Sequence, residues 1–238
     1  MRLHFYIQGV RNGDEARPKK NNMNRSEILE EKVKKIAQSL LKGSRRSHNW
    51  EHTIRVVGLC RRFGLKKGAD MDVLLTSAYL HDIGRDAQDS SKGLLCHAKE
   101  GARIALPIVK QLPLSEEQRK NIIHSIRTHR FRGNHIPETI EAKLLYDADK
   151  LDALGAVGVA RAFLFAGELG ARLHNPDIRV EDAVAYSKDD TGYREYRLKL
   201  CKIKEKLLTD EGKEMALGRH LFMENFFVQF LKEYKGEV

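Results

Sequence analysis

Apolar side chains recur at intervals of three and four residues along most of this chain, and this spacing constrains its fold more than any other feature. Such a repeat gathers the apolar side chains on one face of an α-helix. The alternating apolar and polar pattern of a half-buried β-strand is nearly absent after residue 10. We therefore expect an all-α fold built from amphipathic helices.

Capping residues and glycines mark where these helices should begin and end. Asn24 with Glu27, and Ser115 with Gln118, have the spacing of a capping box. Gly64 follows an apolar run and is expected to end a helix. One helix should be opened by Pro137, and the others cover approximately residues 24–42, 50–63, 70–83, 98–111, 115–128, 148–166, 181–206 and 210–235.

The composition is that of a globular protein. Of the 238 residues, 41% are hydrophobic and 32% are charged, which supports a sizeable core and excludes disorder of the whole chain. No apolar run reaches about 18 residues, so no membrane partner is expected. The three cysteines, Cys60, Cys96 and Cys201, are widely spaced and favour reduced thiols. With no signal-peptide pattern at the N-terminus, we expect a cytoplasmic protein.

The chain carries 43 Lys and Arg residues against 33 Asp and Glu residues, a net charge of +10. This excess favours an anionic partner such as a nucleic acid or a small phosphate ester, but a merely basic surface explains it equally well.

Histidine is concentrated in one part of the chain, where seven of the ten lie between His48 and His135. His81 and Asp82 end an apolar helical run, and adjacent residues at a helix end can flank one ion. Imidazole and carboxylate ligands together suit Mn²⁺, Fe²⁺, Ni²⁺, Co²⁺, Zn²⁺ or Mg²⁺. His48 and His52 share a helix face, although an ordinary hydrogen-bonded pair is the simpler interpretation.

A second acidic segment surrounds Asp149. Asp149 and Asp152 share one helix face, whereas Asp147 is turned away from it. A carboxylate in the first turn of a helix is favourable, which is sufficient to explain Asp147. It explains Asp149 less well, because small residues follow on the same side and suggest a buried face.

Taken together and in this order, these segments resemble the HD-domain superfamily of metal-dependent phosphohydrolases. The resemblance covers about residues 44–166 and is closest to stand-alone bacterial and archaeal HD hydrolases, including nucleotide pyrophosphohydrolase-like members. It implies a helical bundle that binds a divalent metal ion through His52, His81, Asp82 and Asp149. The segments that carry it are Glu51-His52-Thr53-Ile54-Arg55-Val56, Leu80-His81-Asp82-Ile83-Gly84-Arg85 and Asp147-Ala148-Asp149-Lys150-Leu151.

The polar composition of residues 1–24 and the resemblance together predict a division of the chain. We expect a flexible N-terminal extension over residues 1–24, an HD domain over residues 25–166, and a C-terminal helical extension over residues 167–238 that packs on the HD domain.

Two departures from the family pattern concern the catalytic groups. Some members place a glutamate three residues after the His-Asp pair, whereas this chain has Arg85, so Asp86 is the nearest candidate for a general acid–base. Members with two metal ions use additional histidines, for which His97, His124 and His129 are candidates. His124 and His129 are five residues apart, so only one of them faces the metal unless the helix ends between them.

The resemblance implies hydrolysis of a phosphate ester or anhydride in a small phosphorylated substrate such as a nucleotide. The expected catalytic side chains are Arg85, Asp86 and Lys150, with His48, His124 and His129 as further hydrogen-bonding groups. Two alternatives stay open: a di-iron oxygenase, and a metal-bearing module that binds a nucleic acid or another partner without catalysis. The oligomeric state is open as well.

Overall fold

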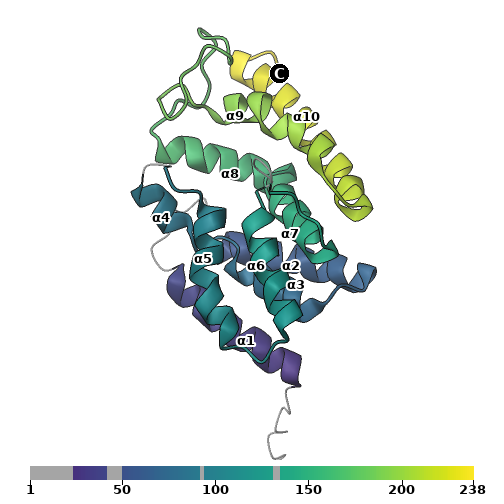
Figure 1. Ribbon diagram of the computed structural model, residues 1–238. Coiled ribbons are helices and arrows are strands. Elements are labelled where there is room, and N and C mark those ends of the chain that lie inside the picture. Colours follow the sequence, from purple (N-terminus) through teal and green to yellow (C-terminus); the bar gives the residue numbers. More distant parts are fainter. Residues whose placement is uncertain (1–23, 42–49, 92–93, 131–134) are drawn as a thin grey trace, which may run out of the picture.

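The computed structural model describes residues 24–41, 50–91, 94–130 and 135–238. These residues fold into helices joined by turns and loops, and no strand occurs among them, which confirms the expected all-α class. Figure 1 shows a bundle of α1 to α7 in the lower part and a layer of α8 to α10 above it. Residues 1–23 lie outside the described part, and the expected division into domains stays a prediction.

The bundle is organised around α3, whose residues are all buried from Val73 to Leu80. This helix packs against α1, α2, α6 and α7. Both expected capping boxes are present, at Asn24 and at Ser115. The bundle helices are α1 (Arg25–Leu40), α2 (Trp50–Lys67), α3 (Met71–Leu80), α4 (Arg85–Ser90), α5 (His97–Lys110), α6 (Glu116–Thr128) and α7 (Ile140–Leu151).

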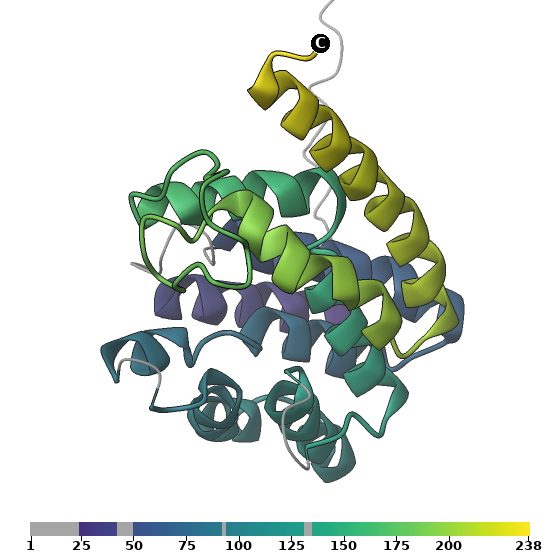
Figure 2. The same cartoon turned by 90° about the horizontal axis from the view of Figure 1, so that it is seen from above.

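The upper layer consists of α8 (Gly155–Glu168), α9 (Gly192–Leu198), the 3-10 helix η2 (Leu200–Lys206) and α10 (Asp210–Lys235). The long α10 packs against α7, α8 and η2, and Figure 2 shows it running along one side of the molecule. Phe163 of α8 lies among the rings of Phe226, Phe227 and Phe230, so the phenylalanine stripe of α10 joins the two helices.

A buried carboxylate ties α10 to the bundle. Asp147 accepts hydrogen bonds from the backbone N–H groups of Leu208 and Thr209 (2.8 and 2.7 Å) and from the Thr209 hydroxyl (2.6 Å). Thr209 is the N-cap of α10. Asp147 therefore does lie at the start of a helix, but this helix is α10. Its own helix, α7, begins earlier, at Ile140.

Three expected helix boundaries are wrong. The second helix continues through Gly64 to Lys67, because this buried glycine leaves room for the side chains of Met71 and Leu74. Residues 148–166 form parts of two helices, separated before Gly155, whose φ of 74° suits a residue without a side chain. Residues 181–191 are irregular, and Thr191 caps a helix that begins at Gly192.

Among the residues that the structure describes, no helix is both long and apolar enough to cross a membrane.

Candidate metal centre

Buried histidines from four helices converge inside the bundle. His52 lies in the first turn of α2 and His97 begins α5, whereas His81 and His129 are the residues that end α3 and α6. None of the four is more than 1% exposed. α6 runs unbroken from His124 to Thr128, so the five-residue spacing applies, and of the two histidines only His129 reaches the cluster.

In each of these histidines the Nδ1 atom faces a hydrogen-bond acceptor. His81 Nδ1 donates to the Ala78 carbonyl oxygen (2.8 Å) and His129 Nδ1 donates to that of Ile126 (2.7 Å), each three residues earlier in its own helix. His52 Nδ1 lies 2.7 Å from Asp152 Oδ2. An acceptor at Nδ1 places the proton there and leaves the Nε2 lone pair for a metal ion.

The fourth histidine, His97, follows the same rule. Its Nδ1 atom lies 3.0 Å from Gln88 Oε1, and that oxygen also accepts from the His97 backbone N–H and from Arg130. Gln88 thereby fixes the ring from α4, through a side chain that sequence reasoning missed.

Asp82 lies between the histidine rings. Its Oδ2 atom is 3.6 Å from Nε2 of both His52 and His81, and its Oδ1 atom is 3.3 Å from His97 Nε2 and 3.6 Å from His129 Nε2. Oδ1 is buried and has no hydrogen-bond partner among the described residues. A buried carboxylate oxygen in this position is suited to bind a cation.

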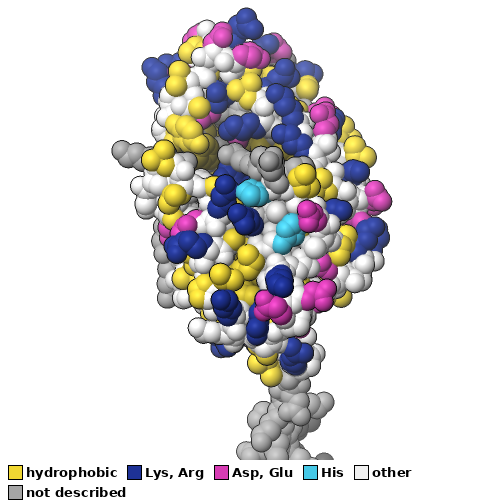
Figure 3. Space-filling model, in the orientation of Figure 1, with side chains coloured by type: hydrophobic (Ala, Val, Ile, Leu, Met, Phe, Trp, Pro, Cys, Tyr) yellow, Lys and Arg dark blue, Asp and Glu magenta, His cyan; other side chains and the backbone are white. Residues whose placement is uncertain are grey.

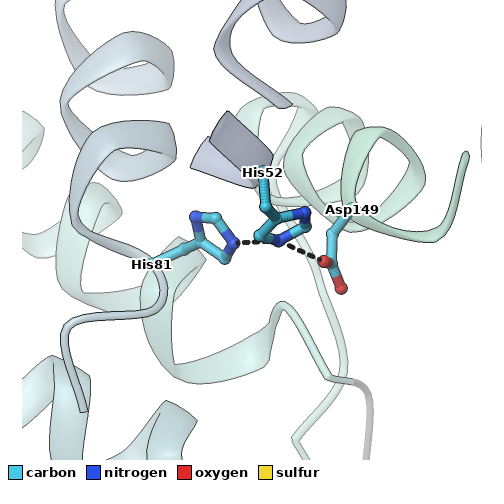
Figure 4. A group of neighbouring side chains, drawn as sticks. All are labelled: His52, His81 and Asp149. Atoms are coloured by element: carbon cyan, nitrogen blue, oxygen red, sulfur yellow. Dashed lines mark hydrogen bonds and ion pairs between the residues drawn. The ribbon is translucent and has the colours of Figure 1, made fainter. Parts of the chain in front are cut away.

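Asp149 completes the cluster from α7. Figure 4 shows its carboxylate and the ring of His81 on either side of His52. Asp149 Oδ1 lies 3.4 Å from His52 Nε2, and Oδ2 accepts from Lys150 at 2.8 Å. Two groups of potential ligands result: His52, His81 and Asp149 in one, and Asp82, His97 and His129 in the other.

Charge and burial set the protonation of these groups. Burial lowers the pKa of His81 to about 4, which keeps this imidazole neutral near pH 7. Burial opposes ionisation of Asp82, but the charge of Arg85 and the neighbouring imidazoles hold its pKa well below the usual range. Burial likewise opposes ionisation of Asp149, whose pKa Lys150 and His52 hold low.

The arrangement of donor atoms fits a divalent cation. The Nε2 atoms of His52 and His81 are 3.2 Å apart, and those of His97 and His129 are 3.1 Å apart. Two lone pairs at this distance repel each other unless a proton or a metal ion lies between them. Burial opposes a charge on His52, yet hydrogen bonds to Asp149 and Asp152 raise its pKa, so the site attracts a cation at this ring. Imidazole and carboxylate ligands suit transition-metal ions.

A cavity of about 610 Å³ adjoins the cluster between the bundle and the upper layer. His97 and Asp149 lie in its wall. Several cations line it as well: Arg85, Arg130, Lys150, Arg161, Lys199, Lys202 and Lys206. On the face seen in Figure 3, Lys and Arg side chains gather around a hollow between the upper and lower parts. The cavity therefore suits an anionic ligand.

The remaining predicted catalytic side chains are dispersed. Arg85 donates through Nε to Asp82 Oδ2 at 3.0 Å, next to the cluster. Asp86 is exposed and is not among the residues that line the cavity, whereas Gln88 and Asp89 on the same short helix are. His124 accepts from the Glu138 backbone N–H through Nε2 (3.0 Å), away from the other histidines. His48 lies outside the described residues.

Sequence reasoning placed Asp152 on the same helix face as Asp149 but gave it no role, and the structure shows an important one. Besides orienting His52, it accepts from Arg55 Nε (2.6 Å) and from Arg161 Nη1 (2.7 Å). Burial opposes its ionisation, but His52 and Arg55 lower its pKa. The spacing of His52 and Arg55, three residues apart on one helix face, is the signal that could have identified a shared partner.

Known proteins resemble this chain over most of its length. A sequence model of the family described as "HD domain" matches residues 49–154. The YpgQ protein of Bacillus subtilis is 31% identical over 222 residues, which are 87% of this chain and 94% of YpgQ. The crystal structure of YpgQ in complex with ADP gives a TM-score of 0.69 at 29% identity, covering 88% of this chain and 97% of YpgQ.

An HD-superfamily hydrolase from Bacillus thuringiensis is similar to the same degree. Its crystal structure gives a TM-score of 0.68 at 29% identity and covers 89% of this chain and 99% of its own.

Proposed function

The chain belongs to the HD-domain family, and from this we propose that it is a divalent-metal-dependent phosphohydrolase whose substrate is a nucleotide. One observation carries the proposal: imidazole nitrogens and carboxylate oxygens converge beside a cavity lined by cations. Such a cavity binds a phosphate chain, and such a cluster binds the ion that activates it. The presence of ADP in the similar YpgQ structure supports a nucleotide over other phosphate esters.

We assign His52, His81, Asp82 and Asp149 as the ligands of the metal ion. When bound, a divalent ion polarises a phosphoryl oxygen and lowers the pKa of a water molecule. Asp152 keeps the Nδ1 proton of His52 in place, so that Nε2 points toward the ion. Burial of the imidazoles excludes competing water from the ligand atoms.

Arg85 and Lys150 flank the cluster and are suited to bind the phosphate group. Arg85 uses Nε for Asp82, and no described residue accepts from its terminal amino groups. These groups are therefore available for the nonbridging phosphoryl oxygens, where charge develops during hydrolysis. Lys150, held by Asp149, places a second positive charge at the same wall.

The proposal is tested by metal analysis combined with a substrate screen. Wild type, Asp149→Asn and the control Asp182→Asn are purified without chelators, and their metal content is determined by elemental analysis. Asp182 is 67% exposed and, among the residues that the structure describes, forms an ion pair only with Arg179, so its variant changes charge without touching the cluster. Release of phosphate or pyrophosphate is then measured on a nucleotide panel with Mn²⁺, Co²⁺, Ni²⁺ or Mg²⁺.

Wild type and Asp182→Asn should bind metal and turn over a nucleotide, and Asp149→Asn should do neither. Metal-dependent turnover that survives in Asp149→Asn would contradict the ligand assignment. Wild type that binds metal but hydrolyses no nucleotide would contradict the proposed substrate. An Asp86→Asn variant added to the set tests whether Asp86 is the general acid–base, as the sequence predicts. If it is, this variant should turn over the nucleotide more slowly while its metal content stays unchanged.

The second group of potential ligands favours one alternative function. Asp82, His97 and His129 are all buried and could hold a second ion next to the first, as a di-iron oxygenase requires. Iron content of two equivalents with oxygen consumption in place of phosphate release would favour the oxygenase over the hydrolase.

A further inference from the structure

The cavity has a wall that the histidine cluster does not account for. Residues of the upper layer form it, among them Phe165 of α8, Tyr186 of the loop between α8 and α9, and the lysines of η2. That loop, residues 169–191, has no helix or strand of its own. Loops of this length are uncommon within a compact fold and are usually either functional or disordered.

Tyr186 has an unusual backbone conformation. Its φ of 59° is the only positive value at a non-glycine position among the described residues. A bulky side chain is disfavoured there by about 1–2 kcal/mol, and a glycine would avoid the strain. The side chain nevertheless is 73% exposed, so burial of the ring does not compensate for the strained backbone.

Buried polar groups hold the loop in this conformation. Asp190 Oδ2 accepts from the Tyr186 backbone N–H at 2.8 Å, and Oδ1 accepts from Arg194 Nη1 at 2.8 Å. Arg194 Nε in turn donates to the Ala183 carbonyl oxygen at 3.0 Å. Asp190 and Arg194 are only 3% and 8% exposed. The buried Asp190–Arg194 pair thus holds the backbone from Ala183 to Tyr186 at both ends. The exposed ring of Tyr186 lies at the cavity wall.

Phe165 supports the ring from α8. The two ring centroids are 6.1 Å apart with an angle of 81° between the planes, the favourable edge-to-face arrangement. Tyr186 also lines the cavity and stays largely exposed despite this contact, so its ring is accessible to a ligand there.

We propose that Tyr186, held by the Asp190–Arg194 pair and backed by Phe165, stacks on the base of a nucleotide whose phosphates lie at the histidine–carboxylate cluster. This assignment rests on the proposed function and adds to that function the side chain that recognises the nucleoside part of the substrate. An exposed, pre-positioned aromatic ring stacks on a planar base at little cost in entropy. The cations that line the same cavity bind the phosphate chain.

Binding of ADP compared with pyrophosphate tests this assignment. Dissociation constants are measured by isothermal titration calorimetry with Mn²⁺ for wild type, Tyr186→Phe, Tyr186→Leu and Tyr186→Gly. Tyr186→Leu and Tyr186→Gly should bind ADP about 5- to 100-fold more weakly, while pyrophosphate binding changes less than about twofold. Tyr186→Phe should stay within about threefold of wild type for both ligands.

Two variants distinguish the effect of the Tyr186 ring on binding from an effect of the substitution on folding. Tyr186→Gly relieves the backbone strain and should melt at or above the wild-type temperature. Tyr234→Leu removes a tyrosine that does not line the cavity and should bind both ligands as wild type does.

Unchanged ADP binding in Tyr186→Leu, with pyrophosphate still bound, would overturn the stacking assignment alone. Equal weakening of both ligands would overturn it too, since the ring would then act on the phosphate site. Wild type that binds neither ligand in the presence of Mn²⁺ would overturn the proposed function together with the assignment.

Discussion

The two walls of the cavity differ in how firmly their polar groups are held. The wall formed by helices of the bundle, which we call the bundle wall, includes His97 and Asp149. The imidazoles there are buried, and each Nδ1 faces an acceptor from its own helix or a neighbouring one. On the opposite wall Lys202 and Lys206 are exposed, and no described residue forms an ion pair with either. Metal coordination requires fixed donors, whereas a charged substrate can be attracted by mobile cations. We infer that the bundle performs the chemistry and that the upper layer selects and holds the substrate.

The largest effect is expected at the centre of the bundle wall. In Asp82→Asn the amide removes the negative charge that lies between both groups of potential ligands. Metal content should fall below about one-tenth of wild type, and kcat/KM for the nucleotide by at least about 10³-fold. Elemental analysis and steady-state kinetics measure the two changes. Asp182→Asn is the charge-matched control, and full metal content in Asp82→Asn would show that Asp82 is no ligand.

A second prediction concerns the connection between the two walls. In Asp147→Asn an NH₂ group replaces either Oδ1, which accepts from Leu208, or Oδ2, which accepts from Thr209. The free energy of unfolding should fall by about 2–3 kcal/mol, because one buried acceptor oxygen is lost and the NH₂ group in its place faces a buried donor. Urea denaturation measures this change, and metal content should be retained because Asp147 does not touch the cluster.

Asp210→Asn is the matched control for that variant. It removes a charge from the exposed first turn of α10 without removing a buried hydrogen bond, so stability should change by less than about 1 kcal/mol. Equal destabilisation by both variants would mean that the helix dipole accounts for the effect of Asp147 and that the buried hydrogen bonds do not.

Sequence reasoning located the bundle wall well. His52, His81, Asp82 and Asp149, which the resemblance to the HD-domain superfamily implied as ligands, do lie together. The five-residue spacing of His124 and His129 predicted that only one of them would face the metal, but it did not say which one. A capping residue can be anticipated within a few positions, but which histidine faces inward changes with every residue.

The opposite wall could not be predicted in the same way. Residues 181–191 were expected to be helical, and the turn around Tyr186 instead depends on the buried Asp190–Arg194 pair. Side-chain hydrogen bonds to backbone N–H groups compete with helix formation at Ser, Thr, Asn and Asp, which are frequent in this segment. The contact of η2 with the cavity follows from the packing of α10 on α7 and α8, which no local pattern encodes.

A third prediction tests how far the rigidity of the bundle wall extends. In Asp152→Asn the neutral amide is a weaker acceptor for His52 Nδ1, and its NH₂ group faces guanidinium donors. Affinity for Mn²⁺ should fall about 10- to 100-fold, as measured by competition with a metal-binding dye. Arg55→Gln removes one partner of Asp152 but keeps the bond to His52, so its loss should be smaller. A larger loss in Arg55→Gln would contradict the orienting role of Asp152.

The smallest effects are expected from the exposed cations of the upper layer. Lys202→Ala and Lys206→Ala should each raise KM for the nucleotide about two- to fivefold without changing kcat, because solvent and salt screen exposed charges. The double variant should show approximately the product of the two effects, and raising the salt concentration should reduce the difference from wild type. Lys235→Ala, at the far end of α10, is the control. A fall in kcat with KM unchanged would instead place these lysines in the chemical step, and the division of labour between the two walls would then be wrong.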